Sequence, residues 1–334
     1  MPAQATSEPP RSEPPRSERS RPEPSDPRPS EPGAVLVVSS HVARGTVGLR
    51  AATLALEALG HPVWAVPTVL LPWHPGHPFR RGETARWRPD EGAFERMLDD
   101  LALAPWLPEV RAVLTGYMAS PEQVHAVARL VERVRARVPD LIVACDPVIG
   151  DLGPGGGGLY VPEAVAAAIR DALLPLADVA APNRFELRWL SGRDAPFTTN
   201  DELRAAAKAL GPARTVVTSA FGLMRGHTGN LLVDAHGATL AEHRTVPRAP
   251  NGTGDLLSAL LVHHLLAGTP GTHGMLERVS ASVFEVVARS VSGTGAGTGA
   301  RAGADGEGVG ELKLEANLAS LRRPFAPVQM RRLA

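Results

Sequence analysis

The sequence has almost no cysteine and no long apolar run. Its one cysteine, Cys145, cannot form an internal disulfide, which argues for a reducing compartment. No apolar run reaches the roughly 20 residues that a membrane-spanning helix needs, and the N-terminus lacks the apolar stretch of a secretory signal. We therefore expect a cytoplasmic protein without a membrane partner, and we interpret Cys145 as a core residue at the end of a strand.

The chain also lacks a net charge. Lys and Arg together number 35, as do Asp and Glu, so the formal charge is zero. This balance removes the electrostatic reason to expect a nucleic-acid partner, although a local basic site for phosphates is compatible with it. With 334 residues, of which 43% are hydrophobic, the chain can form one large α/β domain or two small ones.

Two segments have few side chains that could join a core. Residues 1–33 are rich in Pro, Ser, Glu and Arg, with the run SEPPR twice in succession, and we expect a disordered tail. Residues 292–310 are mostly Gly, Ala and Thr, which predicts a flexible insertion. A folded domain over 34–291 remains, with a C-terminal segment over 311–334 that we expect to pack on it.

Strands and helices alternate along the folded part. Apolar runs predict strands at 34–38, 63–66, 112–116, 141–145, 178–181 and 215–218. Helical patterns occupy 46–59, 121–138, 162–174, 254–266 and 275–290, and a hairpin is expected within 230–246. This alternation is typical of a mostly parallel sheet with helices on both faces. The pattern of 311–321 does not decide between strand and helix.

Polar residues stand where the predicted strands end. They are Ser40, Tyr117, Asp146, Asn183 and Thr218. In open α/β sheets, ligands bind beyond the carboxyl ends of the strands. We therefore expect these side chains to meet at one edge of the sheet and to form a ligand site.

The segment Gly252-Thr253-Gly254-Asp255 directly precedes an apolar helix. Its glycines let the backbone approach an anion closely, and the free amides at a helix start favour negative charge. These amides suit the charge on a γ-phosphate during transfer, and Asp255 could accept the proton of an attacking hydroxyl. In isolation the tetrapeptide would be read as a helix cap, but the apolar helix and the strand-end residues favour the catalytic interpretation.

A carboxylate also follows the predicted strand 141–145. Such a group is costly in a protein interior unless it is hydrated, paired or bound to a cation, and Mg²⁺ is held by one or two carboxylates with phosphates and waters. Asp146 is therefore a candidate magnesium partner through water, as is Glu186. For Glu186, a capping role in the first turn of a helix is an equally favoured alternative.

From about Ala34 to Phe284 the chain resembles the pyridoxal kinase branch of the ribokinase-like superfamily. The resemblance is carried by SHVARGTVG at 40–48, LTGY at 114–117, CDPVIGD at 145–151 with YVP at 160–162, APN at 181–183 with Glu186, and GTGD at 252–255. The CDPVIGD motif is the most specific to this branch. The APN and GTGD motifs are shared more widely across the superfamily.

The resemblance implies an α/β fold, a ribokinase-like three-layer α-β-α sandwich with a mostly parallel central sheet. It implies an ATP-dependent, Mg²⁺-requiring pyridoxal kinase that phosphorylates the 5′-hydroxymethyl group of pyridoxal, and of pyridoxine or pyridoxamine, in vitamin B6 salvage. It also implies a homodimer.

The same resemblance implies roles for individual residues. Asp255 would be the catalytic base and would contact the substrate, with Gly252, Thr253 and Gly254 as the anion hole. The vitamer would further contact Ser40, Thr68 and Tyr117. ATP would be bound by Asp146, Ala181, Asn183, Glu186, Thr218, Arg244, Thr245, Val246 and Pro247, and Asp146 and Glu186 would serve its Mg²⁺.

Three positions depart from the family pattern. Arg44 stands where Tyr is common, and Leu49 and Trp73 stand where Asn is common. Arg44 could reach a phosphate or remain solvated. Because these positions are expected near the vitamer pocket, they bear on substrate identity more than on ATP chemistry.

Histidines are also clustered at two places in the sequence. For His41, His74 and His77 we favour a structural or solvated role over metal binding, because no second ligand cluster accompanies them. The pair His263-His264 falls inside an apolar helix, where packing in the core or at an interface is favoured over chemistry.

Other functions remain as alternatives. The same chemistry could act on another small alcohol, such as hydroxymethylpyrimidine or a sugar, and Ser40, Thr68 and Trp73 would decide between these substrates. A non-catalytic vitamer-binding protein would have no need for an anion nest beside a base. An interaction scaffold built on the proline-rich tail would keep its full function in the tail alone.

Overall fold

The computed structural model describes residues 33–76, 85–152, 157–292 and 310–333. These residues belong to one compact unit, which runs from Pro32 to Ala334. The tail expected at 1–33 and the insertion expected at 292–310 therefore lie almost entirely outside the described residues, as does His77.

A nine-stranded sheet runs through the described residues, in the order β11-β10-β9-β8-β7-β4-β3-β1-β2. Its strands are β1 (Ala34–Val42), β2 (Val63–Leu71), β3 (Val110–Thr115), β4 (Ile142–Cys145), β7 (Val179–Ala180), β8 (Arg214–Phe221), β9 (His227–Asp234), β10 (Gly237–Arg244) and β11 (Gln329–Leu333). The strands from β2 across to β8 are parallel, and β9, β10 and β11 continue the sheet in antiparallel fashion. The prediction of a mostly parallel sheet is confirmed.

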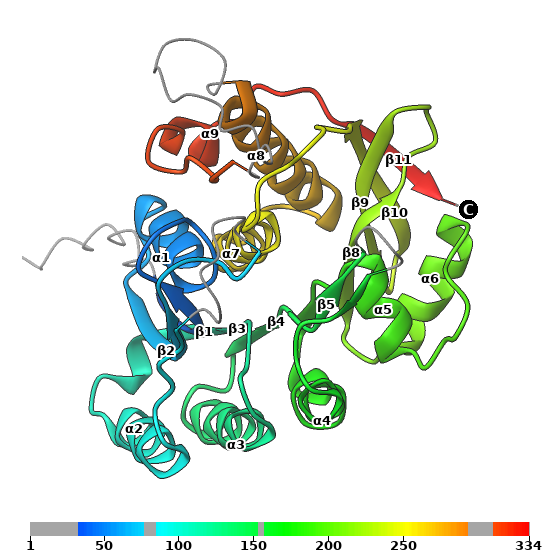
Figure 1. Ribbon diagram of the computed structural model, residues 1–334. Coiled ribbons are helices and arrows are strands. Elements are labelled where there is room, and N and C mark those ends of the chain that lie inside the picture. The colour runs from blue at the N-terminus through cyan, green and yellow to red at the C-terminus, as the bar shows by residue number, and fades with distance from the viewer. Residues whose placement is uncertain (1–32, 77–84, 153–156, 293–309, 334) are drawn as a thin grey trace, which may run out of the picture. The chain divides into compact units, whose positions relative to one another are not determined.

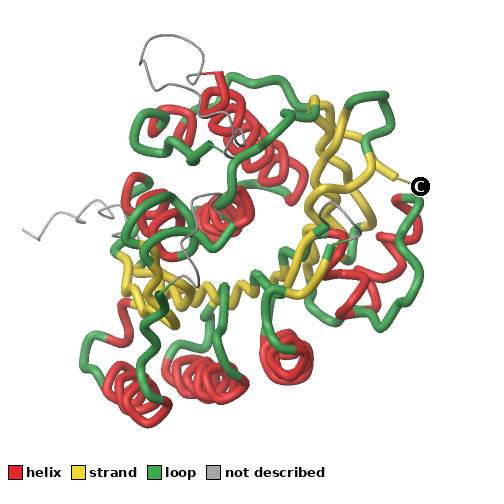
Figure 2. The backbone as a smooth tube through the Cα atoms, in the orientation of Figure 1, coloured by secondary structure: helices red, strands yellow, loops and turns green. Residues whose placement is uncertain are grey.

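Helices cover both faces of this sheet, so the fold has three layers (Figures 1 and 2). One face carries α1 (Leu49–Ala58), α7 (Thr253–Leu266) and α8 (Thr272–Ser292), with α9 (Leu318–Arg322) packed on α8. The other carries α2 (Glu91–Leu103), α3 (Pro121–Arg137), α4 (Glu163–Ala168), α5 (Arg184–Leu190) and α6 (Asn200–Ala209). A short hairpin of β5 (Gly150–Asp151) and β6 (Gly158–Leu159) stands apart from the main sheet. Short 3₁₀ or π turns occupy Leu107–Glu109, Ile169–Leu173 and Leu174–Leu176.

The surroundings of β1 explain why its sequence is continuously apolar. Val35 and Val37 pack into the core beneath α1 and α7, whereas Leu36 and Val38 pack into the core beneath α2 and α3. A strand buried on both faces needs apolar residues at every position rather than at alternate ones. β1 therefore lies between β2 and β3 with both of its faces covered.

Helix α7 is apolar on every side. Residues 256–262 are all buried, between the sheet and the helices α1 and α8. Within the described ranges, the structure has no helix of the length and apolarity that crossing a membrane requires. Helix α7 is thus a core element, and its N-terminal turn is held in place by the packing of the whole helix.

Some element boundaries differ from those predicted. The strand β1 continues through Ser39 and Ser40 to Val42, and β2 continues to Leu71, because their register pairs these residues with one another. The helix expected over 162–174 ends as an α-helix at Ala168 and continues as a π turn. The start of α3 is as predicted, with the Ser120 side chain accepting a hydrogen bond from the N–H of Gln123.

Candidate active site

The polar residues at the strand ends lie along one edge of the sheet, as predicted. The N–H of Asp146 donates to the carbonyl of Thr115 at 2.9 Å, which joins the ends of β4 and β3. The N–H of Ala181 donates to the carbonyl of Cys145 at 3.0 Å, and Asn183 pairs with Thr218 in a parallel bridge. Backbone hydrogen bonds therefore bring together four segments that are far apart in the sequence.

Glu186 has a structural role that the structure shows directly. It closes a capping box with Asn183 at the start of α5, where its Oε2 accepts the N–H of Asn183 at 2.8 Å. Its Oε1 accepts the N–H groups of Ile149 at 3.1 Å and Gly150 at 3.5 Å. The side chain amide of Asn183 in turn donates to the carbonyl of Gly150 at 2.8 Å. Together these contacts tie α5 to the chain that follows β4, so the capping alternative describes what Glu186 does in this structure.

Asp146 is a buried carboxylate with few compensating contacts. It is 6% exposed, and its Oδ2 accepts the hydroxyl of Ser258 at 2.8 Å. Burial, with a smaller contribution from the negative charge of Asp255, raises the pKa of Asp146 to about 7, and the Ser258 hydrogen bond opposes this rise. Burial and the charge of Asp146 also raise the pKa of Glu186 well above its usual value. Buried carboxylates that lie close together favour the binding of a cation.

Asp255 stands in the first turn of α7 and is half-buried. Burial raises its pKa, while hydrogen bonds from the N–H of Gly48 and from its own N–H oppose that rise. The Gly48 contact orients the carboxylate from a loop that lies outside its own helix. Asp255 is thus a positioned carboxylate, as a general base requires.

The turn before Asp255 depends on glycine. Gly252 has φ +92°, a left-handed conformation, and a Cβ at this position would lie 2.1 Å from the carbonyl oxygen of Thr46. Gly254 is exposed, and a Cβ there would lie 3.8 Å from Oδ2 of Asp146. The turn is therefore pressed against the β1–α1 loop on one side and open beside Asp146 on the other. Main-chain amides are accessible there to an anion.

The β1–α1 loop joins the predicted base to the predicted vitamer contact. Gly48 has φ +57°, and a Cβ there would lie 2.2 Å from the carbonyl oxygen of Ser40. Gly48 thus touches Ser40 on one side and donates to Asp255 on the other. The structure brings Ser40 and Asp255 to the two sides of a single glycine.

Thr68 lies within β2, and Tyr117 follows the end of β3. Thr68 is 0% exposed, and its hydroxyl donates to the carbonyl of Tyr117 at 2.8 Å. The N–H of Tyr117 donates to the Ser39 hydroxyl at 3.2 Å, and its side chain packs beside Val42. Thr68 therefore supports Tyr117 from behind, and its contact with a vitamer stays a prediction.

The three departures from the family pattern occupy different surroundings. Arg44 is exposed, in agreement with the solvated alternative, and it forms an ion pair with Glu311 at 2.7 Å that the sequence did not indicate. Leu49 is buried in the core beside α7. Trp73 is half-buried in the segment after β2, where the neighbouring His74 contacts Asn251 at 3.2 Å.

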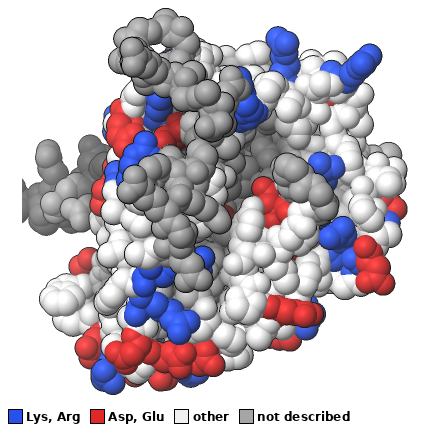
Figure 3. Space-filling model, in the orientation of Figure 1, with Lys and Arg blue, Asp and Glu red and all other residues white. Residues whose placement is uncertain are grey.

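The predicted nucleotide-bordering residues Arg244 to Pro247 are mostly exposed and begin the connection from β10 to α7. The N–H of Thr245 donates to the carbonyl of Gly226 at 2.9 Å, which joins this connection to the loop between β8 and β9. The connection leads directly into the Gly252 turn. The side of the molecule drawn in Figure 3 has a hollow, and acidic side chains lie just inside the edge of this hollow.

Two residues of the site were not predicted. Ser258 lies one turn beyond Asp255 and holds Asp146, and Gly48 holds Asp255. A serine inside an otherwise apolar helix was the available signal for Ser258, because a buried hydroxyl requires a partner. Gly48 had no comparable local signal, since its importance comes from contacts between distant segments.

The remaining titratable residues singled out in the sequence are structural. Cys145 is buried, which confirms its core assignment, and burial raises the pKa of its thiol to about 12. His263 shares a hydrogen bond of 2.9 Å with His61, and His264 shares one of 2.9 Å with Thr269. These rings lie at the C-terminal end of α7, as the packing interpretation predicted.

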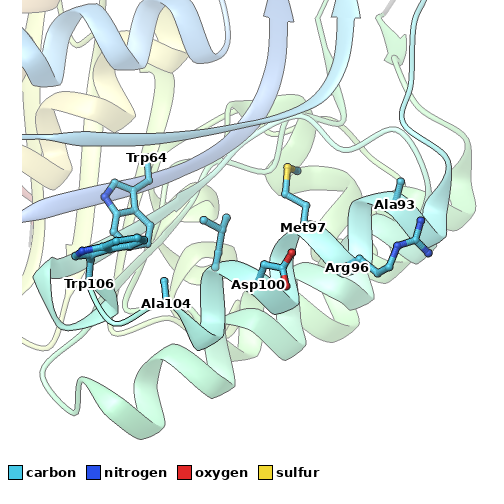
Figure 4. Close-up of a pocket in the computed structure, with 8 residues that line it drawn as sticks. Trp64, Ala93, Arg96, Met97, Asp100, Ala104 and Trp106 are labelled. Carbon is cyan, nitrogen blue, oxygen red and sulfur yellow. The ribbon is translucent and has the colours of Figure 1, made fainter.

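A groove of about 540 Å³ lies away from these residues, between β2 and α2 (Figure 4). Trp64 and Trp106 line it with Met97, Arg96 and Asp100. Trp64 is the second residue of β2, so the groove lies toward the amino ends of the strands. Ligands of such sheets bind at the opposite edge, and we assign this groove no part in the chemistry.

A protein family, individual sequences and a solved structure that are similar to this chain are all small-molecule kinases. A family model described as phosphomethylpyrimidine kinase matches residues 106–277. A pyridoxine/pyridoxal/pyridoxamine kinase of Bordetella bronchiseptica is 37% identical over 263 residues, which cover 77% of this chain and 89% of that protein. A pyridoxal kinase PdxY of Rubrobacter xylanophilus is 33% identical over 305 residues, covering 90% and 97%. A pyridoxal kinase structure from Leishmania donovani, in complex with ADP and pyridoxamine, superimposes with a TM-score of 0.75 at 28% identity and covers 90% of this chain and 100% of that chain.

Proposed function

The chain belongs to the pyridoxal kinase family of the ribokinase-like superfamily, and from that premise we propose how its residues phosphorylate a vitamin B6 vitamer. It is a pyridoxal kinase, which transfers the γ-phosphate of ATP to the 5′-hydroxymethyl group of pyridoxal. One observation carries the residue assignment. The open Gly252 turn, Asp255 and Asp146 lie together at the carboxyl edge of the sheet.

Asp255 acts as the general base. The Gly48 N–H holds its carboxylate in place, and the neighbouring Ser40 supports the vitamer whose hydroxyl is to react. The hydroxyl oxygen forms a bond to the γ-phosphorus as the bond from that phosphorus to the bridging oxygen of ADP breaks. The hydroxyl proton passes to Asp255, late in a loose transition state, and ADP leaves with the electron pair of the broken bond.

The Gly252 turn stabilises the migrating phosphoryl group. The amides of Gly252, Thr253 and Gly254 stand at the N-terminus of a 14-residue helix, where the helix dipole favours negative charge. Because α7 is buried along its length, these amides are held in position before the reaction begins. The collision expected between a Cβ at 252 and Thr46 supports a requirement for glycine in this turn.

Asp146 and Glu186 fit a magnesium ion bound chiefly by the nucleotide. Mg²⁺ commonly uses one or two carboxylates, with phosphates and waters completing its six positions. Asp146 is buried beside a second acidic group, an arrangement that a cation relieves. Both oxygens of Glu186 accept backbone N–H groups, so its contact with the ion would pass through water. When bound, the ion would neutralise charge on the phosphates.

In this proposal the nucleotide lies along Asp146, Ala181, Asn183 and Thr218. It extends to the connection that begins at Arg244. The backbone bridge between Asn183 and Thr218 supports this path, because it joins the ends of two strands into one surface. Ser40 and Tyr117, with Thr68 behind Tyr117, form the vitamer side.

We extend the proposal to the assembly and location of the protein. A homodimer follows from family membership, and light scattering coupled to gel filtration tests it directly. A cytoplasmic location is supported by the single buried Cys145, which needs no oxidising compartment.

A second substrate is favoured by one observation. The matching family model describes phosphomethylpyrimidine kinases, so hydroxymethylpyrimidine is the alternative alcohol. We expect the departures at Trp73 and Arg44 to affect the vitamer side of the site, where the two substrates would differ.

A substrate panel tests the proposed function. ADP release is measured with pyridoxal, pyridoxine, pyridoxamine, hydroxymethylpyrimidine and ribose, with and without Mg²⁺. We expect the highest kcat/KM with a B6 vitamer and no turnover in a chelator. Turnover with hydroxymethylpyrimidine alone would establish the second candidate, and no ADP release with any alcohol would refute a kinase.

A further inference from the structure

Arg184 is a half-buried cation beside the candidate nucleotide site. It is the first residue of α5 and directly follows Asn183. Its guanidinium lies 4.3 Å from the ring centroid of Phe221, a distance typical of a cation–π contact. The position differs from that of a solvated surface arginine, whose head group extends into water.

The surroundings of Arg184 are unfavourable for a cation. A positive charge in the first turn of a helix opposes the helix dipole. The buried Nε–H of Arg184 has no hydrogen-bond partner among the residues that the structure describes. Within the described ranges, the structure shows no ion pair of 4 Å or less between Arg184 and a carboxylate. A buried donor without an acceptor is costly, and such violations concentrate at functional sites.

The neighbours of Arg184 place it at the carboxyl edge of the sheet. Asp151 follows Gly150, whose carbonyl accepts the side chain amide of Asn183. Phe221 ends β8, three residues beyond Thr218, which pairs with Asn183. Arg184 therefore lies just outside the two strand ends that we assign to the nucleotide.

The charges at this edge call for a positive partner. Asp146, Glu186, Asp255 and Asp151 supply acidic groups. A nucleoside triphosphate adds several negative charges to this cluster. Arg44, another cation near the site, is engaged by Glu311. Arg184 is the half-buried cation that adjoins Asn183 directly.

We propose that Arg184 binds a phosphate group of the nucleotide and thereby contributes to the affinity of this site for ATP and ADP. This inference rests on the proposed function, because it assumes that the nucleotide lies along Asn183 and Thr218. A phosphate oxygen would accept the Nε–H of Arg184, which has no acceptor among the described residues, in a charge-assisted hydrogen bond. Phe221 supports the plane of the group, so little side-chain freedom is lost on binding.

Nucleotide affinity in matched variants tests the proposal. Calorimetric Kd values for ADP and adenosine are compared in wild type, Arg184→Met, Arg184→Lys and Arg188→Met. Arg188 lies one turn further along α5, over the ring of Phe185 at 5.2 Å, and its place near the helix C-terminus suits a cation.

Removing a charged hydrogen bond of this kind typically weakens binding about 10- to 100-fold. We expect that loss for ADP in Arg184→Met, partial recovery in Arg184→Lys, unchanged adenosine affinity, and no change in Arg188→Met. Equal ADP affinity in Arg184→Met and wild type would overturn the proposal.

The variant Asp151→Asn separates phosphate binding from a purely structural contact. If the only role of Arg184 were to hold the β5–β6 hairpin through Asp151, Arg184→Met and Asp151→Asn would weaken ADP binding to the same extent. Phosphate binding predicts the opposite sign, because removing a negative charge beside the nucleotide leaves ADP affinity unchanged or raises it. A loss in Asp151→Asn equal to that in Arg184→Met would contradict the proposal.

The binding measurement also separates this inference from the proposed function. ADP bound tightly by wild type and weakly by Arg184→Met supports the role of Arg184, even if the substrate panel finds no phosphorylated vitamer. An active kinase whose ADP affinity does not depend on Arg184 would refute this inference alone.

Discussion

The two ends of helix α7 both carry buried titratable groups, yet they differ in what surrounds them. At the N-terminal end, Asp255 stands beside a turn whose Gly254 is exposed. At the C-terminal end, the rings of His263 and His264 lie 4.9 Å apart, and the partners of both are protein groups. Burial raises the pKa of Asp255 and lowers the pKa of both histidines to about 4.

The comparison shows that a displaced pKa does not identify an active site by itself. Burial alone moves the pKa of acids up and of histidines down, wherever they lie. The N-terminal end differs because the exposed Gly254 adjoins the carboxylate and a second acid, Asp146, lies nearby. The chemistry is inferred from this open arrangement, while the closed histidine cluster serves packing.

The largest effect is expected from Asp255→Asn. Loss of the general base should lower kcat by about 10²- to 10⁴-fold, because the amide cannot accept the proton. The variant should still bind ADP and pyridoxal, measured by calorimetry. His263→Gln, at the other end of the helix, is the control and should keep the wild-type kcat. Phosphorylation of pyridoxal by Asp255→Asn at the wild-type rate would show that the base assignment is wrong.

The glycines at the two ends of α7 give a second test. Gly252 and Gly268 both have positive φ values, so alanine at either position costs about 1–2 kcal/mol. Only at Gly252 does a Cβ collide, with Thr46 O at 2.1 Å, whereas nothing lies within 4 Å at Gly268. We expect Gly252→Ala to lower kcat/KM at least tenfold and to destabilise the fold more than Gly268→Ala, which should remain fully active.

Chemical unfolding of both variants, together with ATP-dependent turnover, measures this difference. Equal activities in the two variants would show that the contact between the turn and the β1–α1 loop is unimportant for catalysis.

The two ends should also respond differently to pH. His263 and His264 stay neutral in the folded protein down to about pH 4 but are protonated below about pH 6.5 when unfolded. The unfolded state then binds more protons, so the free energy of unfolding falls as pH drops from 6.5 to 4, by at most about 1.4 kcal/mol per pH unit for each histidine.

Asp146, with a pKa of about 7, must be ionised to serve a cation, so kcat/KM for ATP should fall below pH 7.

Urea unfolding at pH 7.5 and pH 5, compared between wild type and His263→Gln/His264→Gln, isolates the histidine contribution. The variant should show a smaller loss of stability on acidification and an unchanged pH profile of kcat/KM. A pH profile that shifts with the histidines would mean that the two ends of α7 are coupled.

The smallest effect is expected from Arg44→Gln. The ion pair of Arg44 with Glu311 is largely exposed, and such pairs contribute about 0–1 kcal/mol. Unfolding in urea should therefore change by less than this amount, and the KM for pyridoxal should change only a few-fold. A large rise in the KM for ATP would instead indicate that Arg44 leaves Glu311 for a phosphate.

Much of the fold was predictable because burial leaves a clear pattern. Continuous apolar runs identified strands that are covered on both faces, and polar residues after them identified the edge where ligands bind. The extent of β2 was missed because Pro67 interrupts its pattern. Proline is tolerated there because β2 is an edge strand of the described sheet.

Other elements lacked such a pattern or were overlooked. The strand β11 has the sequence QMRRL, and its strand conformation depends on pairing with β10 rather than on its own residues. Helix α6 was missed although a capping box of Thr199 and Glu202 marks its start. Helix α2 was missed although Asp90 caps it.

The candidate site was predictable only where its parts are local in sequence. The Gly252–Asp255 turn and the strand-end residues form recognisable local motifs. Gly48 and Ser258 act through contacts between segments that are distant along the chain, and no local rule specifies which segments will meet. Glu186 shows the opposite case, because the local capping rule was one of two equally favoured interpretations and describes its contacts in the structure.

The contact of the Gly252 turn with Thr46 has a consequence for folding. The base and its supporting amide belong to an early and a late segment of the domain, so neither segment has a functional site until both are docked. Contacts between such distant segments form slowly, because a large loop must close before they contribute. In a refolding experiment, helical signal should therefore return before turnover, and the regain of kinase activity would report that the whole domain has assembled.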